Sequence, residues 1–212
     1  MVDSGSVLRT LAIIINILLI VYVWIIIIRA LISWVNPDPH NPFITFLNRI
    51  TEPVLSLARR ITPSTGRIDL SPITAIFAII FIRIFLVGTL LLFADSGDNF
   101  QAVFILGMFV YAVMTLFRML IHFLIIIIVV WAIISWVNPN PYNPIVLALF
   151  AMVDPILRPI QRIIPPVGGF DITPIIAVLI LLAVNYTVVR GLFVLAAMFL
   201  PTPYTYIHPT FF

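Results

Sequence analysis

Four apolar stretches dominate the chain and limit what it can fold into. They cover about residues 7–35, 71–93, 102–136 and 173–199. Each exceeds the roughly 20 residues that an α-helix needs to cross the hydrocarbon core of a bilayer. The first and third are longer still, so they must tilt or project beyond the bilayer, and a kink near Arg118 is an alternative for the third. With 63% hydrophobic and 9% charged residues, the chain is far more apolar than a soluble domain, which predicts an all-α membrane protein.

A repeat of about 102 residues divides the sequence into two similar halves. Ser33-Trp34-Val35-Asn36-Pro37-Asp38-Pro39-His40-Asn41-Pro42 recurs as Ser135-Trp136-Val137-Asn138-Pro139-Asn140-Pro141-Tyr142-Asn143-Pro144. The same register, without a gap, pairs Pro53 with Pro155 and Asp69 with Asp171. We therefore predict two tandem copies over 7–95 and 102–199 and a tail over 200–212, each copy being a span, an interfacial segment and a second span.

Proline indicates where the spans end and begin. The prolines of the repeated motif cannot continue a helix, because proline lacks a backbone N–H and restricts the residue before it. The second span of each copy opens with Asp-Leu-Ser-Pro or Asp-Ile-Thr-Pro. Ser71 and Thr173 are suited to the N-cap position, with proline at the first helical position. Asp69 and Asp171 place negative charge beside the positive end of each helix.

Between the two spans of each copy lies a segment that mixes apolar residues with arginine, over residues 43–61 and 145–164. Arginine on one helical face and Leu, Ile and Phe on the other are typical of a helix that lies in the membrane interface. Pro53 and Pro155 are expected to split each segment into two short helices. The predicted fold is therefore four transmembrane helices plus two proline-split amphipathic interfacial helices.

The placement of arginine predicts the orientation in the membrane. Six arginines lie in the interfacial segments or the loops beside them: Arg49, Arg59, Arg60, Arg67, Arg158 and Arg162. The loop at 94–99, between the copies, is acidic instead. The positive-inside rule then places both interfacial segments in the cytoplasm and both termini outside. Trp34 and Trp136 fall at the inner interface, where tryptophan is favoured.

Polar side chains inside the spans are costly and indicate candidate functional positions. They are Asn16, Arg83, Arg118, His122, Asn185 and Arg190. The repeat aligns Asn16 with Arg118 and Arg83 with Asn185. At 1.5 Å per residue, Arg83 and Asn185 lie about 18 Å from the cytoplasmic end, near the midplane. Arg118 and Arg190 lie about 27 Å from that end, so they can extend to the outer interface.

Three roles remain open for Arg83. A polar clasp with Asn185 that fixes helix packing is favoured, and the alternatives are an anion or water-lined path and a proton relay or catalytic role. Arginine is a poor acid–base catalyst because it does not titrate in a useful range. His122 is interpreted as a packed core histidine rather than a haem ligand or titrating group, since no second histidine follows at a suitable spacing. His40 and His208 each stand alone and predict no metal site.

The Asn-Pro turns are the most specific motif. The favoured interpretation is that the prolines end the helices and the asparagine side chains bond to the turn backbone. The alternative is a docking surface for a protein partner, with Asp38, His40, Glu52 and Arg60 beside it. Glu52 and Asp154 are expected to pair with Arg60 and Arg162 or with arginines across the repeat. The candidate residues of this cytoplasmic face are Ser33, Trp34, Asn36, Pro37, Asn41, Pro42, Glu52, Arg60, Asp69, Ser135, Trp136, Asn138, Pro139, Asn143, Pro144, Asp154, Arg162 and Asp171.

The sequence offers no pattern that points to an enzyme. It contains no cysteine, which excludes disulfides, zinc thiolate sites, iron–sulfur clusters and thiol catalysis. No nucleophile–base pair, glycine-rich phosphate loop or metal-ligand spacing is visible in it. A net charge of +3 does not suggest a nucleic-acid partner. We therefore expect no catalysis, no cofactor and no metal.

The paired Ser-Trp-Val-Asn-Pro-x-Pro-x-Asn-Pro motifs resemble those of the YggT family of membrane proteins, which includes the YlmG branch. The acid-Pro-x-Leu run, the Arg-Ile-x-Pro run and the Gly-x-x-Asp-x-Ser/Thr-Pro run that follow resemble it as well, over roughly residues 10–95 and 110–198. The resemblance implies a bacterial inner-membrane protein associated with osmotic-stress tolerance and potassium homeostasis. Plastid relatives are linked to haem attachment in cytochrome b6 assembly and to nucleoid distribution. No catalytic residues carry over, and Arg158-Pro159 departs from Ser56-Leu57 of the first copy.

Two functions follow as expectations. The first is a non-enzymatic membrane scaffold or assembly factor for envelope complexes, which presents residues 36–70 and 138–172 to a protein partner. The alternative is an ion-flux component of potassium homeostasis or an osmotic-response component, and an intramembrane enzyme comes third. The expected partners are membrane lipids, a protein at the cytoplasmic interface and a further copy of the chain.

Overall fold

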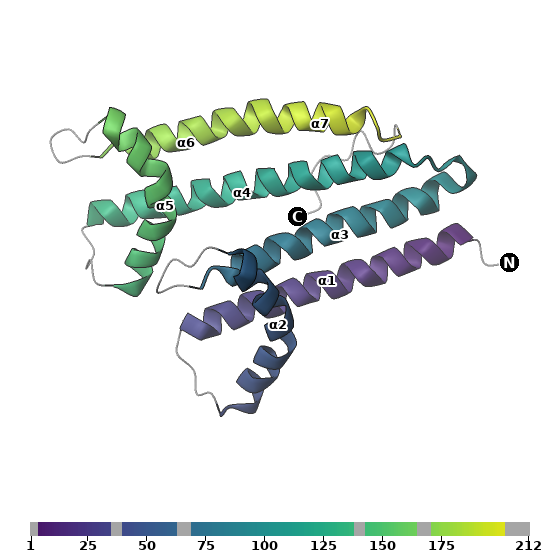
Figure 1. The fold of residues 1–212 in the computed structure, drawn as a ribbon, viewed down its shortest axis with the longest axis horizontal. Helices are drawn as coiled ribbons and strands as arrows, with labels where there is room; N and C mark the ends of the chain where they lie inside the picture. The colour runs from purple at the N-terminus through teal and green to yellow at the C-terminus, as the bar shows by residue number, and fades with distance from the viewer. Residues whose placement is uncertain (1–3, 35–39, 63–68, 138–142, 165–170, 202–212) are drawn as a thin grey trace. The chain divides into compact units, whose positions relative to one another are not determined.

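The computed structural model describes residues 4–34, 40–62, 69–137, 143–164 and 171–201 (Figure 1). Within these ranges the chain is helical and contains no strand, which confirms the all-α fold class. The elements are α1 (Ser4–Trp34), α2 (Pro42–Ile61), α3 (Ser71–Ser96), a 3₁₀ turn (Gly97–Asn99), α4 (Val103–Val137), α5 (Pro144–Ile163), α6 (Thr173–Val184), a π-helical segment (Asn185–Val189) and α7 (Arg190–Ala197).

Among the described residues, four segments are long and apolar enough to cross a membrane, as predicted. They are Ser4–Ser33, Ser71–Asn99, Val103–Ser135 and Thr173–Ala197. The third runs as one α-helix through Arg118. The fourth contains α6, the π-helical segment and α7 in succession. The chain is therefore a helical membrane protein built from two span–helix–span arrangements.

The helices group into two compact units, each with its own apolar core. The first unit contains the described residues up to Val113 together with those from Leu195 onward, and the second contains Met114–Val194. Both boundaries fall inside continuous helices, α4 and α7. Each amphipathic helix thus lies in the same unit as residues of both spans of its own copy.

In the first unit, α1 and α3 lie side by side, and α2 crosses them near the end where α1 finishes and α3 begins (Figure 1). The core of this crossing contains one buried residue of α1, two of α2 and two of α3: Ile26, Leu55, Ala58, Ala75 and Ile79. On α2 the buried residues recur along one face, because residues three and four apart share a helical face: they are Leu47, Thr51, Leu55 and Ala58. Their burial holds α2 against both spans.

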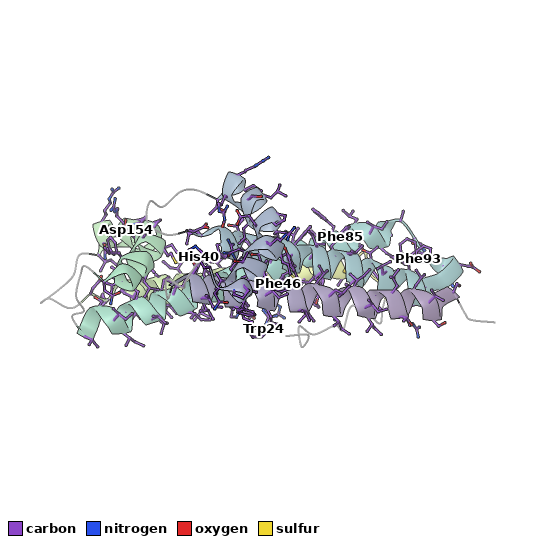
Figure 2. The ribbon with its side chains drawn as sticks, turned by 90° about the horizontal axis from the view of Figure 1, so that it is seen from below. Trp24, His40, Phe46, Phe85, Phe93 and Asp154 are labelled. Carbon is purple, nitrogen blue, oxygen red and sulfur yellow. The ribbon has the colours of Figure 1, made fainter. Side chains whose placement is uncertain are left out.

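A second apolar cluster joins the far end of α3 to the start of α4. It contains Leu92, Met108 and Leu200, with Phe85 and Phe100 packed around them. Gly88 lies close to Met108: a side-chain carbon at position 88 would lie 2.5 Å from the Met108 sulfur, so the methionine side chain would have to move. Figure 2 shows Phe85 and Phe93 at this end of α3, and the Phe93 ring packs on that of Phe100 at 4.7 Å between centroids.

The second unit repeats the first core at matching positions. Its buried residues are Ile127, Ile128, Val153, Leu157 and Ala177, contributed by α4, α5 and α6. In the register of the repeat, Ile128 corresponds to Ile26, Leu157 to Leu55 and Ala177 to Ala75. The sequence repeat is therefore also a repeat of packing within each unit.

Two expectations about helix ends were wrong. Pro53 and Pro155 do not split their segments, because α2 and α5 each continue as one helix through them. An internal proline removes only one backbone hydrogen bond, and the core residues on both sides of Pro53 hold the helix together. Ser71 and Thr173 are the first helical residues rather than the N-caps. The Asp69 and Asp171 carboxylates accept their backbone N–H groups instead, at 2.8 and 2.9 Å.

The two second spans differ in regularity. Residues 71–96 form one α-helix, whereas the corresponding span is interrupted by the π-helical segment Asn185–Val189. A π segment inside an α-helix often lies at a functional position. Asn185, the counterpart of Arg83, is its first residue.

Candidate functional site

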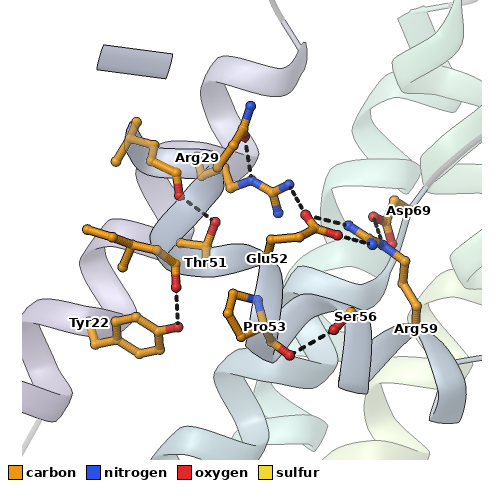
Figure 3. A network of polar contacts seen from close by, with 11 residues as sticks. Tyr22, Arg29, Thr51, Glu52, Pro53, Ser56, Arg59 and Asp69 are labelled. Carbon is orange, nitrogen blue, oxygen red and sulfur yellow. Dashed lines mark hydrogen bonds and ion pairs between the residues drawn. The ribbon is translucent and has the colours of Figure 1, made fainter. Parts of the chain in front are cut away.

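A network of charged side chains fastens α2 to α1 and to the start of α3 (Figure 3). The Arg29 guanidinium donates to Glu52 Oε2 at 2.9 Å and to Asn48 Oδ1 at 2.9 Å. Arg59 donates to both carboxylate oxygens of Glu52, and its Nε donates to Asp69 Oδ2 at 3.3 Å. These five residues are called the charged network below.

Helical spacing explains why these residues meet. Asn48, Glu52 and Arg59 are separated by four and seven residues on α2, which brings them to the same side. Arg60 is turned about 100° further around the helix and is exposed. The prediction that Glu52 pairs with Arg60 was therefore wrong. Glu52 pairs with Arg59 and Arg29 instead.

Sequence reasoning missed two residues of this site, Asn48 and Arg29, and a signal in the sequence existed for Arg29. Arg29 lies inside the first apolar stretch, and its counterpart in the second copy is Trp131. Its side chain is only 19% exposed, so it needs a nearby carboxylate to offset the loss of hydration. The replacement of this arginine by tryptophan in an otherwise similar second copy could have indicated that Arg29 has a specific role in the first copy.

Further polar bonds attach α2 to its neighbours. The Tyr22 hydroxyl of α1 donates to the Ile50 carbonyl at 3.0 Å, and the Thr62 and Thr74 hydroxyls lie 2.8 Å apart. Ile50 lies on α2 and Tyr22 on α1, so this bond joins the amphipathic helix directly to the first span. The fully buried Thr51 donates to Leu47 within the helix at 2.7 Å.

The network also sets the charge states of its acids. The hydrogen bond from Arg59 lowers the pKa of Glu52, and together with the charges of Arg59 and Arg29 it outweighs the opposing effect of burial. At Asp69, partial burial raises the pKa, but the backbone N–H of Ser71 and the Arg59 guanidinium outweigh it, so the pKa is lowered. Both acids are therefore charged at neutral pH.

The second unit arranges the matching positions differently. The Trp131 and Phe150 rings, which stand at the positions of Arg29 and Asn48, pack at 5.4 Å. Asp154 pairs with Arg158, one turn along α5, at 2.8 Å. The prediction that Asp154 pairs with Arg162 was wrong, because Arg162 is turned further around the helix, as Arg60 is on α2. Arg162 is exposed.

The start of α6 keeps the polar pattern of the first unit. Asp171 accepts from the Thr173 backbone at 2.9 Å, from its hydroxyl at 2.6 Å and from Gln161 at 3.0 Å. Gln161 takes the place of Arg59. Partial burial of Asp171 raises its pKa, but the Thr173 and Gln161 hydrogen bonds outweigh it and lower the pKa overall.

A second ion pair lies at the other end of the α1–α3 pair. Arg9 and Asp95 approach to 2.7 Å. Residues 10–28 between Arg9 and Arg29 carry no charge, and a helix covers about 30 Å between the two arginines at 1.5 Å per residue. This length equals the hydrocarbon thickness of a bilayer. The two ionic levels therefore fit the two membrane surfaces.

The intramembrane polar residues are divided between the two units. In the first unit, Asn16 and Arg83 are half-buried. In the second, Arg118 is half-buried, Arg190 donates to the Tyr186 hydroxyl at 2.8 Å, and the exposed His122 lies 2.8 Å from the Arg118 carbonyl. The expectation of a packed core histidine was therefore wrong, because its position on α4 turns it away from the core.

Arg83 and Asn185 belong to different units, so the clasp between them stays a prediction. The Asn185 Oδ1 atom is buried and has no hydrogen-bond donor among the described residues. Such a group is costly in hydrocarbon. Asn185 is thus an additional candidate position within the second unit.

The Asn-Pro motif fixes the start of the amphipathic helix. Asn41 is the N-cap of α2, and its side chain accepts from the Phe43 N–H at 2.9 Å, with Pro42 at the start of the helix. Pro144 begins α5, and the Asn143 carbonyl accepts from Leu147 at 3.0 Å. The capping interpretation is confirmed for Asn41. Ser33 and Trp34 end α1, Ser135 and Trp136 lie in the last turn of α4, and Asn36, Pro37, Asn138 and Pro139 lie outside the described residues.

Comparison with known proteins identifies the family. The CCB3/YggT family model matches the chain twice, over residues 8–90 and 110–192. The chain belongs to the CCB3/YggT family. This confirms the resemblance drawn from the Asn-Pro motifs, and the two matches correspond to the two copies.

The relatives of this CCB3/YggT protein match most of its length. The uncharacterized protein YggT of Escherichia coli (strain K12) is 29% identical over 194 residues, or 92% of this chain and 97% of the relative. An uncharacterized protein in the proC 3' region of Vibrio alginolyticus is 30% identical over 170 residues, covering 80% and 88%. An uncharacterized protein of Haemophilus influenzae is 29% identical over 161 residues, covering 76% and 81%. No solved structure matches the chain.

The charged network combines ion pairs with exposed charge. Within the described ranges, no three His, Asp or Glu side chains come together in a way that could hold a metal ion. Glu52, Arg59 and Asp69 are each about half exposed, at 41–51% of their side-chain area. The network can therefore both brace α2 and present charges to a partner.

Proposed function

We propose that this CCB3/YggT protein is a non-enzymatic integral membrane scaffold or assembly factor that organises envelope complexes and supports osmotic-stress tolerance. It acts at the inner membrane of a bacterium, with α2 and α5 on the cytoplasmic side and both termini outside. A protein partner binds the charged side of α2. The arginine-rich segments support this orientation through the positive-inside rule.

One observation carries the proposal. Glu52 is bonded both to Arg29 of a span and to Arg59 of α2, so a polar surface is fixed rigidly to the membrane-spanning pair. Rigid placement reduces the conformational entropy that this surface would lose when a partner binds. The half-exposed charges offer complementarity to a partner, which favours specificity and the association rate.

Site-specific photocrosslinking in native membranes tests this proposal. A photoreactive residue replaces Ser56, which is exposed on the same polar side of α2. The matched control replaces Trp24, which is 60% exposed and extends outward from α1 (Figure 2). We expect one protein to be captured from position 56 and not from position 24, and Arg59→Glu to abolish the capture. Recovery of lipid and the chain alone from both positions would overturn the scaffold proposal.

An ion-flux component is the second candidate, and Arg83 is its support. Arg83 lies twelve residues from both Ser71 and Asp95, or about 18 Å from each surface. An arginine at this depth is a functional candidate by default, and its charge favours anions over potassium. Potassium and chloride flux into proteoliposomes would be compared for Arg83→Gln and the exposed control Arg190→Gln. Flux that is lost in Arg83→Gln alone would favour this candidate, and flux unchanged by either variant would remove it.

A further inference from the structure

Two arginines of α2 take no part in the charged network. Arg49 and Arg60 are both exposed, and neither forms a hydrogen bond or ion pair with any described residue. They are eleven residues apart, which is about three helical turns, so they lie on the same side about 16 Å apart. Glu52 is already paired with Arg29 and Arg59. The two charges are therefore uncompensated within this part of the protein.

An exposed apolar ridge runs beside these arginines. Phe43, Phe46, Leu57 and Ile61 are 55–77% exposed. Their spacings of three, eleven and four residues keep them on one side of α2. This ridge borders the buried face that carries Leu55 and Ala58, whereas the charged network lies on the opposite border. The helix thus has three faces, one for the protein core, one for polar contacts and one that is unoccupied.

The position of α2 identifies what covers the third face. The charged network lies at one end of the uncharged 30 Å of α1, where the hydrocarbon core meets the headgroups. An apolar ridge at this level inserts among acyl chains. The arginine stems lie along the apolar surface while their guanidinium groups reach the phosphate level.

We propose that this face of α2 binds anionic phospholipid, with Arg49 and Arg60 contacting the headgroup phosphates. Charge complementarity selects an anionic lipid over a zwitterionic one. The face is specific to the first copy, because α5 has Ala151 in place of Arg49 and its Arg158 is already paired with Asp154. This proposal is independent of the scaffold function, which uses the charged network, about 90° around α2 from Arg49 and Arg60.

Lipid titration of the purified, delipidated full chain tests the proposal. Retained phosphatidylglycerol and phosphatidylcholine are counted by native mass spectrometry from mild detergent. We expect tighter binding of phosphatidylglycerol, by about five-fold for each of the two arginines. The double variant Arg49→Gln/Arg60→Gln should lose this preference, while Arg49→Lys/Arg60→Lys should keep it because the charge is retained. The matched control Arg162→Gln on α5 should leave it unchanged.

The possible outcomes are distinguishable. Equal binding of both lipids by the unmodified chain, or a preference that survives the double glutamine variant, would overturn the proposal. Equal losses in the double variant and in Arg162→Gln would also overturn it, since they would indicate attraction to the overall charge. Circular dichroism of each variant confirms folding, and a protein bound at this face would be recognised by its mass.

Discussion

In the first copy, α2 is joined to α1 by Arg29 with Asn48 and Glu52, and the matching contact in the second copy is a pair of aromatic rings, Trp131 and Phe150. Thr62 and Thr74, whose hydroxyls meet in the first copy, are replaced by isoleucines in the second. The buried Thr51 is replaced by the buried Val153. Residues that make polar contacts around α2 thus correspond to apolar residues around α5.

The apolar core, by contrast, is kept. Ile26, Leu55 and Ala75 are buried together in the first unit, and Ile128, Leu157 and Ala177 are buried together in the second. The comparison teaches that burial of this core is sufficient to place an amphipathic helix across two spans. The charged network of the first copy is therefore not needed to specify the fold, and its charges are available for recognition.

The largest expected effect tests the shared part of the comparison. Leu55→Ala and Leu157→Ala each remove a side chain that is at most 2% exposed and leave a cavity, so each should reduce the free energy of unfolding by about 2–5 kcal/mol. Denaturant unfolding of the purified chain in mild detergent measures this. Leu57→Ala, which truncates an exposed residue of α2, should change it by less than about 0.5 kcal/mol. A much smaller loss for Leu157→Ala than for Leu55→Ala would show that the two cores are not equivalent.

The next largest effect tests the difference between the copies, which is the charged network of the first. Glu52→Gln leaves the partly buried Arg29 without its carboxylate and should ease local opening of α2 by about 1.5–3 kcal/mol. Asp154→Asn removes only a one-turn pair on α5 and should ease opening there by about 0.3–0.5 kcal/mol.

The cysteine-free sequence supplies matched probes for these openings. Thr51→Cys and Val153→Cys place a single thiol at corresponding buried positions. Glu52→Gln should raise thiol labelling at position 51 by about tenfold or more, since 1.4 kcal/mol is a factor of ten. Asp154→Asn should raise labelling at position 153 by only about two-fold. Similar increases at both positions would remove the distinction between the copies.

Acid should reproduce part of the Glu52→Gln effect. The pKa of Glu52 is lowered, chiefly by the hydrogen bond from Arg59, so the stabilisation is complete above the ordinary value of 4.5. It is lost as the pH falls through the lower pKa of the folded state. Hydrogen exchange, corrected for its intrinsic pH dependence, should show α2 opening more than α5 below this pH. Lowered pKa values at Asp69 and Asp171 affect both copies, and the excess in α2 should disappear in Glu52→Gln.

The smallest expected effect concerns the repeated turn. Asn41→Ala removes the acceptor for the Phe43 N–H and should cost about 1 kcal/mol, measured as faster hydrogen exchange in the first turn of α2. The repeated motif predicts a similar effect of Asn143→Ala on α5. No change in α5 would mean that the same sequence performs a different task in the second copy.

The sequence alone determined the elements and their order. Four apolar stretches, a repeat and the Asn-Pro turns predicted four spans, two amphipathic helices and the family, because span length and helix capping depend on residues close in sequence. The cap by Asn41 and the positions of Asp69 and Asp171 beside the helix starts were also predicted from residues close in sequence. The predictions for Pro53 and for the N-cap of α3 failed by small margins, since contacts from other helices and from Asp69 decide the exact ends.

Only the tertiary structure decided which charges meet. Arg29 and Glu52 are 23 residues apart, and their pairing depends on how α2 crosses α1. The choice of Arg59 over Arg60 depends on about 100° of helical rotation relative to that crossing. The apolar pattern gives a helix its buried face, but the neighbouring helix fixes what each polar side chain touches. This physical reason explains why the helices could be predicted from the sequence and the charged network could not.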